Sequence, residues 1–566
     1  MTPCEAENGG PSGGSSGKTS DGPSDAEVFI GLDLGTSSLK GVAVTAGGEV
    51  AARGHAPYHT TRDAPGQAEQ DPGNWLRALR RVVRQMQAAA PPRRWRAIGL
   101  SAMIPTLVTV DASGAPTGPA VTWEDARAEA QGDAYRAAAG EALCATAGAF
   151  LKAEQSRAGI PGDGPSALYK QTGQWVDGRY LLPMWMRLRE AESSRVAVAT
   201  RLLSAKDYLF WWLTGEYATD PSTATGFGCF RLTGGAWAAA AAAAAGVSSA
   251  DGVLETAGRP GRPGLPAVLP SKATRPLTVA AAKSLGLPAG LPVCLGAADS
   301  VLGALALGAA RSGDVAYITG TSSVILGVSA DFTPESEHRC LVTPLATGAG
   351  WGLEMDLLST GSAVDWLARL LRFGKGGAAK LMELVASVDI AAASVASAGS
   401  TVTAPGVRFY PYLGGGEQGA LWDPDLRGTI VGLDLAQGPA DLVSALVDGI
   451  VCESRRCLEV LEQNGVPPAS LRIAGAGASS PVFRRRLADA CGREVLFAAD
   501  TERPYSAIGA ALVAARATGS PPADPQSWTG PLEATRPDAG ARAWWDARYS
   551  AHLAEAEGVR RLYHKS

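Results

Sequence analysis

The sequence lacks the features that mark several classes of protein. Its eight cysteines show no CxxC spacing, which argues against a zinc site or a disulfide framework and favours a reducing cytoplasm. The 51 basic and 55 acidic residues are mixed without a long basic block, so we expect no nucleic acid and no membrane surface as a partner. No stretch has the roughly 20 apolar residues of a membrane span, and the alanine-rich residues 236–247 predict a surface-packed helix instead.

The start of the chain differs in composition from the rest. Residues 1–26 are rich in Gly, Ser, Asp and Pro and lack the apolar core of a signal peptide, so we expect a disordered tail. Of all 566 residues, 46% are hydrophobic, which is enough to bury large cores and predicts two or more domains. Small molecules are the expected ligands.

One tetrapeptide, Gly-Thr-Ser-Ser, occurs twice, at residues 35–38 and 320–323. Each copy lies between two apolar segments in a pattern typical of strand, tight turn and strand, and a motif repeated once per half indicates a duplicated domain. A single copy would be an ordinary hairpin, since these are common turn residues. Two copies in equivalent contexts, the first preceded by Asp33, favour phosphate binding by backbone N–H groups and hydroxyls.

The pattern around each turn predicts an α/β fold. Asp71 is placed to cap a helix that begins at Pro72, and a strand follows at residues 97–101. The second half repeats this order with a helix over residues 439–464 and a strand over residues 471–474. We expect the halves to join near residues 298–313, within which residues 301–310 predict an apolar helix. A cleft between two domains is the usual place for a site.

Six motifs in fixed order carry a resemblance to the FGGY family of carbohydrate kinases, and the resemblance covers about residues 27 to 550. The motifs lie at residues 33–38, 69–72, 122–127, 297–299, 320–323 and 475–480. The resemblance implies two ribonuclease-H-like domains of the actin and hexokinase type with an interdomain cleft. It places a sugar-binding domain at 27–308 and an ATP-binding domain at 309–550. After these we expect a C-terminal helical tail at 551–566.

Two aspartates are implied to carry the chemistry. Asp299 follows a strand and small residues that leave room for a ligand, and the resemblance implies that it is the catalytic base; the alternative from the residues alone is a cap for the following helix. Asp33 resembles the family carboxylate that positions hydrated Mg²⁺, a hard cation that prefers oxygen ligands. Phosphoryl transfer needs both a base and a metal on the phosphates.

The implied nucleotide side combines both turns with two glycine-containing segments. Small residues there let the backbone approach a ribose or a flat ring. The residues on this side are Gly35, Thr36, Ser37, Ser38, Lys40, Gly320, Thr321, Ser322, Gly361, Asp365, Gly475, Gly477, Ala478 and Ser480.

The implied sugar side contains Met103, Ile104, Trp123, Asp125 and Arg127. An aromatic face suits C–H groups, and a carboxylate with a guanidinium suits hydroxyls. The alternative is a buried tryptophan beside a surface ion pair.

Three stretches depart from the family pattern or remain open. Ile104 stands where many xylulokinases carry a histidine that touches the ketose, and Gln418 stands where the family usually has arginine. The segment 138–180 looks longer than usual and contains Trp175, Asp177 and Arg179. Both a lid and a surface insertion fit this segment, and we favour the surface insertion.

The sequence thus predicts a cytoplasmic kinase that uses ATP and Mg²⁺ to phosphorylate a hydroxyl of a small sugar. D-xylulose, giving xylulose 5-phosphate, is the preferred substrate, and gluconate or another polyol or sugar acid is the alternative. A different class of protein, a catalytically idle binder of sugar or nucleotide, is disfavoured because Asp33, Asp299 and both turns are retained. A homodimer is an assembly that the sequence leaves open.

Overall fold

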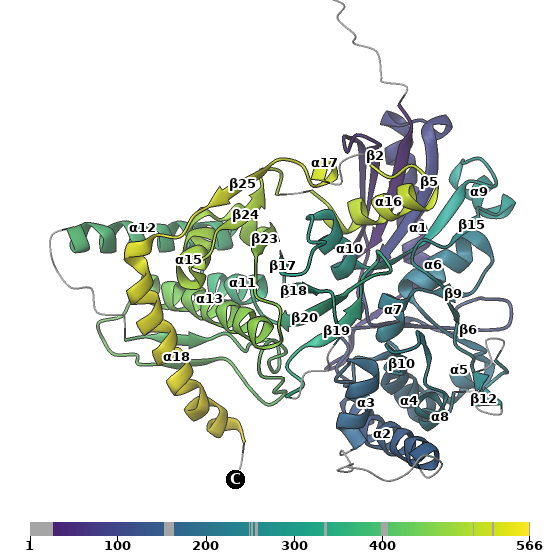
Figure 1. Cartoon of the computed structure of the whole chain (residues 1–566), viewed down its shortest axis with the longest axis horizontal. Helices are drawn as coiled ribbons and strands as arrows, with labels where there is room; N and C mark the ends of the chain where they lie inside the picture. The colour runs from purple at the N-terminus through teal and green to yellow at the C-terminus, as the bar shows by residue number, and fades with distance from the viewer. Residues whose placement is uncertain are drawn as a thin grey trace, which may run out of the picture.

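The structure is a computed structural model that describes residues 26–151, 164–247, 249–250, 253–254, 258–332, 337–397, 406–501, 503–522 and 526–564. The predicted disordered tail lies almost wholly outside these residues. Two lobes face each other, each built on one large sheet (Figure 1). We call the part on the six-stranded sheet the first lobe and the part on the seven-stranded sheet the second lobe.

The sheet of the first lobe begins with the predicted hairpin. β1 pairs antiparallel with β2 and parallel with β5, while β2 pairs antiparallel with β3 and β16 lies parallel to β5. In spatial order the strands are β15 (Thr274–Pro276), β16 (Pro292–Ala298), β5 (Trp95–Ala102), β1 (Val28–Leu34), β2 (Ser38–Thr45) and β3 (Val50–Pro57).

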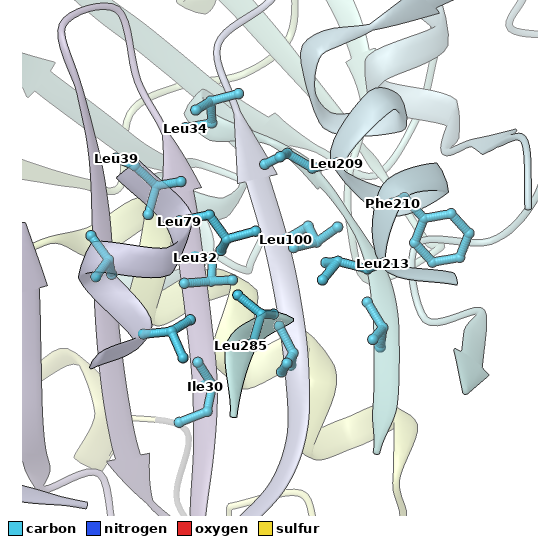
Figure 2. Packing of buried hydrophobic residues seen from close by; sticks show 14 of the residues in the cluster. Ile30, Leu32, Leu34, Leu39, Leu79, Leu100, Leu209, Phe210, Leu213 and Leu285 are labelled. Atoms are coloured by element: carbon cyan, nitrogen blue, oxygen red, sulfur yellow. The ribbon is translucent and has the colours of Figure 1, made fainter. Parts of the chain in front are cut away.

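Apolar helices cover one face of this sheet. They are α1 (Pro72–Ala89), α6 (Ala205–Thr214) and α9 (Val279–Leu285). The Asp71 carboxylate accepts a hydrogen bond from the Gly73 N–H, so the predicted cap and start of α1 are confirmed. Leu79 of α1 packs with Leu32 of β1 and Leu100 of β5 in the resulting core (Figure 2). Burial of these side chains fixes the sheet that carries the first turn.

The second lobe repeats the same strand arrangement. Three antiparallel strands, β20, β18 and β17, continue into the parallel strands β23 and β24. In spatial order its sheet is β19 (Leu341–Pro344), β20 (Trp351–Leu357), β18 (Ser323–Ser329), β17 (Asp314–Thr319), β23 (Ser470–Gly475), β24 (Val495–Ala498) and β25 (Leu532–Thr535). Because β3, β2, β1, β5 and β16 follow the same order, the predicted duplication and fold class are confirmed.

Long helices pack around the second sheet. They are α11 (Gly361–Leu370), α12 (Gly377–Ser397), α13 (Pro439–Gln463), α15 (Pro481–Cys491) and α18 (Arg542–Tyr563). The predicted C-terminal tail at 551–566 overlaps the end of α18, whose buried His552 bonds to Glu453 of α13.

Helix α16 (Tyr505–Ala517) connects the lobes. It comes late in the chain, yet it packs on β1 and β5 of the first lobe and on α10 (Asp299–Ala306) (Figure 1). Two glycines allow this approach: a Cβ on Gly31 would lie 1.7 Å from the Ala507 carbonyl oxygen, and one on Gly99 would lie 2.0 Å from that of Ala510. The domain boundary at 308/309 stays a prediction.

A helical layer extends the first lobe below a small sheet of β4 (Glu69–Gln70), β7 (Ala120–Thr122), β6 (Thr106–Val110) and β8 (Arg201–Ser204). Its helices are α2 (Glu129–Leu151), α3 (Gly164–Thr172), α4 (Leu181–Ala191), α5 (Ser193–Val198), α7 (Pro221–Thr225) and α8 (Ala239–Ala244). Within the described residues, no helix has the length and apolar character to cross a membrane.

Two predicted helices are shorter than expected. In the alanine-rich stretch, α8 covers only six residues, because Ala236–Trp237 form strand β11, paired with β10 (Phe230–Arg231). In the predicted helix 301–310, α10 ends at Ala306, since Gly308 adopts a positive φ of 78° that ends the helix.

Candidate active site

A cavity of about 200 Å³ lies between the lobes. Both lobes line it, so the predicted interdomain cleft is present. Its lining residues are Thr36, Met103, Ile104, Pro105, Trp123, Asp177, Arg179, Tyr180, Asp299 and Ser300 from the first lobe, and Ser322, Val324, Leu341, Glu354, Asp356, Leu358, Gln418 and Trp422 from the second.

Asp33 lies at the end of β1, directly before the first turn. It is 8% exposed, and its Oδ1 accepts a hydrogen bond of 2.8 Å from Ser101 on the neighbouring β5. Burial raises the pKa of this carboxyl, while Ser101 and Lys40 oppose the rise. In the part of the chain that the structure describes, Oδ2 has no hydrogen-bond partner, so one oxygen remains free to face a ligand.

The first turn is held by side chains from three places in the sequence. The Gly35 N–H donates to the Ser38 carbonyl, and the Tyr58 hydroxyl donates to the Gly35 carbonyl. Gln70, from the motif at 69–72, donates to the Thr36 carbonyl at 2.7 Å. Trp123 donates from Nε1 to the Thr36 hydroxyl at 3.1 Å, which joins the predicted sugar side to this turn. Ser37 and Lys40 are exposed beside it.

The second turn is held by the start of α11. The Gly361 N–H donates to the Gly320 carbonyl at 3.1 Å, and the Ser362 N–H donates to the Thr321 carbonyl at 3.0 Å. A Cβ on Gly361 would lie 2.3 Å from the Gly320 carbonyl oxygen, so only glycine fits. Gly320 and Thr321 themselves are exposed. The Gly320 N–H donates to the Ser322 carbonyl at 2.8 Å, whereas the Thr321 N–H and hydroxyl are left accessible to an anion.

The glycine-containing segment at 475–480 lies against the same turn. The Gly477 N–H donates to the Thr319 hydroxyl at 2.7 Å, and Gly475 has a positive φ of 84° with no room for a Cβ beside the Thr319 carbonyl. Ala478 is buried in the short helix α14 (Ala476–Ser479), and Ser480 caps α15. These residues therefore gather with Gly320 and Gly361. Asp365 lies further along α11 and lines a second, more open cavity with Arg369 and Arg372.

Asp299 begins α10 and lines the cavity. Its Oδ1 accepts a hydrogen bond from the Ser300 N–H, so it also has the local bond expected of a helix start. Burial, followed by the nearby charge of Asp33, raises the pKa of Asp299 to about 7. A carboxyl with a pKa near neutrality is suited to accept a proton from a hydroxyl group.

A buried network fixes the backbone next to Asp299. The Ala298 N–H donates to the Ser222 hydroxyl at 2.9 Å, and that hydroxyl donates to Asp220. Lys206 lies 3.2 Å from Asp220 and 3.0 Å from Asp207, with all three side chains fully buried. Removing Lys206 would leave two buried carboxylates without their counter-charge, so the cluster depends on this residue.

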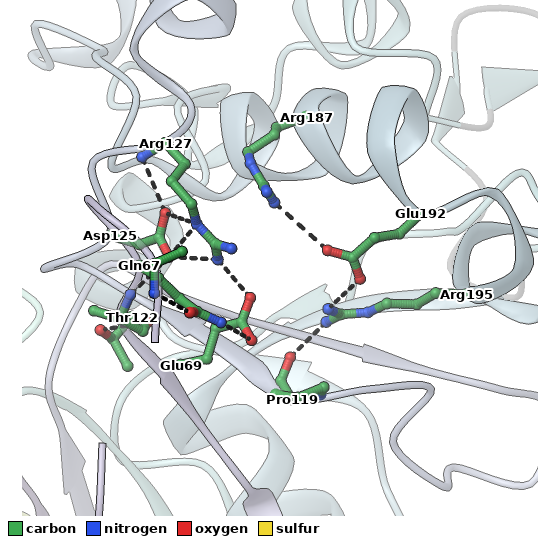
Figure 3. A network of polar contacts seen from close by, with 11 residues as sticks. Gln67, Glu69, Pro119, Thr122, Asp125, Arg127, Arg187, Glu192 and Arg195 are labelled. Atoms are coloured by element: carbon green, nitrogen blue, oxygen red, sulfur yellow. Dashed lines mark hydrogen bonds and ion pairs between the residues drawn. The ribbon is translucent and has the colours of Figure 1, made fainter. Parts of the chain in front are cut away.

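Asp125 and Arg127, predicted to touch sugar, lie beside the cavity and do not line it. The buried Asp125 carboxylate accepts bonds from the Ala68 N–H at 2.9 Å and from the Arg127 guanidinium, which also contacts Glu69 (Figure 3). A separate set of contacts nearby joins Glu192 to Arg187 and Arg195. In this structure their polar atoms are engaged with protein, whereas Met103, Ile104 and Trp123 do line the cavity.

The sequence interpretation missed several cavity residues. Glu354 and Asp356 occupy alternate positions of β20, so both face the cavity. Burial is the main reason that the pKa of Glu354 is raised well above its ordinary value and that of Asp356 to about 6. The spacing of two acids in an otherwise apolar strand was an available signal.

The preferred interpretation of segment 138–180 as a surface insertion is wrong at its end. Asp177, Arg179 and Tyr180 line the cavity, because the chain turns inward between α3 and α4. Gln418, noted only as a departure, reaches the same point from the second lobe.

Two duplicated α/β lobes that enclose a carboxylate of raised pKa, with a Gly-Thr-Ser-Ser turn on each side, define a sugar kinase of the actin and hexokinase ATPase fold. The chain belongs to the FGGY family of carbohydrate kinases: the family's N-terminal domain matches residues 28–149 and 162–306, and its C-terminal domain matches residues 315–518. It is a carbohydrate kinase, and ATP is the nucleotide expected for the family.

Individual relatives cover nearly the whole chain. The xylulose kinase of Escherichia coli K12 is 27% identical over 545 residues, which are 95% of this chain and 98% of that protein. The gluconokinase of Bacillus subtilis 168 is 24% identical and covers 87% of this chain and 88% of its own length. The crystal structure of xylulose kinase from Rhodospirillum rubrum has a TM-score of 0.76 and 26% identity, covering 95% of this chain and 100% of that one.

Proposed function

We propose that this kinase transfers the terminal phosphoryl group of ATP to a hydroxyl of a neutral sugar, with D-xylulose as substrate and xylulose 5-phosphate as product. The observation that carries the proposal is the excess of acidic over basic groups in the cavity. Asp177, Asp299, Glu354 and Asp356 line it, and Arg179 is the one cation among the described lining residues. Carboxyl oxygens accept hydrogen bonds from hydroxyl groups in either protonation state, whereas the ionised ones repel the carboxylate of a sugar acid.

In the proposed reaction, Asp299 accepts the proton of the attacking sugar hydroxyl. Its pKa of about 7 leaves much of it ionised at neutral pH, and its position is fixed through Ala298 and Ser222. The exposed N–H and hydroxyl of Thr321 in the second turn would hold phosphate oxygens, close to the glycine-containing segment that suits the adenosine. The first turn faces the same phosphates from the other lobe.

The donors at Asp33 suit Mg²⁺. This hard cation prefers carboxylate oxygens and retains several waters, and Asp33 offers one oxygen that the described residues leave unbonded. Bound there, Mg²⁺ would neutralise charge on the phosphates. Ser101 holds the other oxygen, so it orients the carboxylate.

Gluconate is the second candidate, favoured by the Bacillus subtilis gluconokinase relative and by Ile104, which removes the imidazole expected near a ketose. A cytoplasmic location and a homodimer remain predictions from the sequence.

Sugar-dependent ADP release distinguishes these functions. Purified enzyme with ATP and Mg²⁺ is assayed with D-xylulose, D-gluconate and glycerol at matched concentrations. We expect the highest kcat/KM with D-xylulose. A higher value with D-gluconate would replace the proposed substrate with a sugar acid, and ADP release that no sugar stimulates would favour an idle binding protein.

A further inference from the structure

Arg179 has a free donor in the cavity. Its Nε donates to Asp177 at 3.1 Å, and its Nη2 contacts the same carboxylate. Nη1 has no hydrogen-bond partner among the residues that the structure describes. The side chain is 26% exposed and lines the cavity that contains Asp299, so a ligand there can reach this edge of the guanidinium.

Asp177 receives a second bond from the opposite lobe. The Gln418 side chain donates from Nε2 to Asp177 Oδ2 at 2.9 Å. The Gln418 backbone carbonyl accepts a hydrogen bond from the Asp356 N–H at 3.1 Å. Asp177 is thereby fixed between a partner in its own lobe and one across the cleft. A guanidinium held by a fixed carboxylate loses less conformational freedom when it binds a ligand.

The loop that carries Gln418 is built around one carboxylate. Glu417 accepts backbone hydrogen bonds from Gly419, Ala420, Leu421 and Trp422, which curls residues 417–422 into a compact turn. Trp422 adopts a positive φ of 50°, a strained conformation for a bulky side chain. Its Nε1 is a buried donor without a partner in the described chain, and the residue lines the cavity. The loop therefore presents Gln418 and Trp422 to the same space as Arg179.

We propose that Arg179 is a substrate-binding residue for a neutral polyhydroxy compound and that Gln418 positions it across the cleft through Asp177. The guanidinium donates to sugar hydroxyl oxygens from Nη1, while Asp177 holds its other edge. Sugar affinity then depends on contact between the lobes, because the Gln418 bond forms only where the two meet. This inference rests on the proposed function in taking a neutral sugar as the ligand.

The test is a double-mutant cycle on sugar binding. The variants are Arg179→Met, Gln418→Met and their combination, with Arg187→Met as a matched control. Arg187 lies on the adjoining α4 and pairs with Glu192 outside the cavity. Kinetics are measured with the sugar of highest kcat/KM, and binding of D-xylulose is measured separately by calorimetry without ATP. Thermal unfolding checks that each variant folds.

We expect Arg179→Met to raise the sugar KM about 10- to 100-fold, as loss of a hydrogen bond from a charged group does, with the KM for ATP within about twofold. Gln418→Met alone should raise the sugar KM about threefold, and it should have no further effect when Arg179 is already absent. The control should match wild type. If Arg179→Met folds poorly, Arg179→Lys replaces it in the test. Lysine keeps the charge but lacks the two-edged guanidinium, so the sugar KM of Arg179→Lys should be intermediate.

Several results would overturn the proposal. A sugar KM for Arg179→Met within about twofold of wild type would remove Arg179 from the sugar site, and additive effects in the cycle would remove the positioning role of Gln418. Wild-type turnover of D-gluconate in place of D-xylulose would sink the proposed substrate, yet the cycle would still be judged on gluconate. Wild type that binds D-xylulose without turnover would overturn the proposed function, and calorimetry on the variants would still test the roles of Arg179 and Gln418 in sugar binding.

Discussion

The two Gly-Thr-Ser-Ser turns share a sequence but differ in register and in what precedes them. In the first lobe Leu34 pairs with Leu39 across four turn residues, whereas in the second Thr319 pairs with Ser323 across three. Two residues before the glycine, the first lobe has Asp33 and the second has Ile318. The neighbouring parallel strand offers Ser101 to Asp33 but only Ala474 to Ile318.

This difference shows how a duplicated fold divides its work. A buried carboxylate is tolerated only where a hydrogen-bond donor lies beside it, and Ser101 supplies that donor in the first lobe alone. The second lobe instead joins its turn to α11 and to the glycine-containing segment through N–H groups. We therefore expect acid chemistry on one side of the cleft and nucleotide binding on the other.

The largest effect on activity should come from substitution of Asp299, the proposed base. Asp299→Asn removes the proposed base without changing its size, so kcat should fall about 10²- to 10⁴-fold while ATP binding stays nearly unchanged. Steady-state kinetics and nucleotide titration measure both. A variant that keeps more than half of the wild-type kcat would show that Asp299 is not the base.

Equivalent substitutions two residues before each turn should have unequal effects. Asp33→Ala should lower activity about 100-fold or more, and extra Mg²⁺ should not restore it, because the carboxylate orients the ion as well as attracting it. Ile318→Ala, its counterpart, should stay within several-fold of wild type. Activity is measured over a range of Mg²⁺ concentrations. Equal losses in both variants would remove the distinction between the lobes.

The matching threonines of the two turns should separate the substrates. Thr321→Val removes an exposed hydroxyl at the proposed phosphate site and should raise the KM for ATP about 5- to 10-fold. Thr36→Val removes the acceptor of the Trp123 N–H and should act on the sugar KM by a similar factor. Initial rates with each substrate varied in turn give both constants. If both variants changed the same constant, the division between lobes would be wrong.

The smallest effect should be a shift in the pH profile. The base must be ionised to accept a proton, so kcat/KM should fall as the pH drops through about 7, the pKa of Asp299. The charge of Asp356 contributes to this raised pKa; Asp356→Asn should therefore lower the pKa and move the acidic limb to lower pH. Asp434→Asn, an exposed acid in the second lobe, is the control. An unmoved or raised limb in Asp356→Asn would contradict the proposed coupling.

Local patterns predicted much of the fold. The cap at Asp71, both hairpins and the helix that begins at Pro439 follow from signals within a few residues, and each occurs as expected. The cavity was harder to predict, because Asp177 and Gln418 are 241 positions apart in the sequence and meet only through tertiary packing. Asp125 and Arg127 were predicted to bind sugar because their side chains suit hydroxyl groups. In the structure these two side chains bond to each other, which the sequence pattern alone did not indicate.

The place of α16 has a consequence for the order in which the protein can fold during synthesis. One face of the first sheet packs against a helix that the ribosome adds about 400 residues after β5. Until residues 505–517 emerge, α16 does not cover the backbone at Gly31 and Gly99. The apolar surface of the sheet there must be shielded in another way during this time. The first lobe is thus first in sequence and among the last parts to be completed.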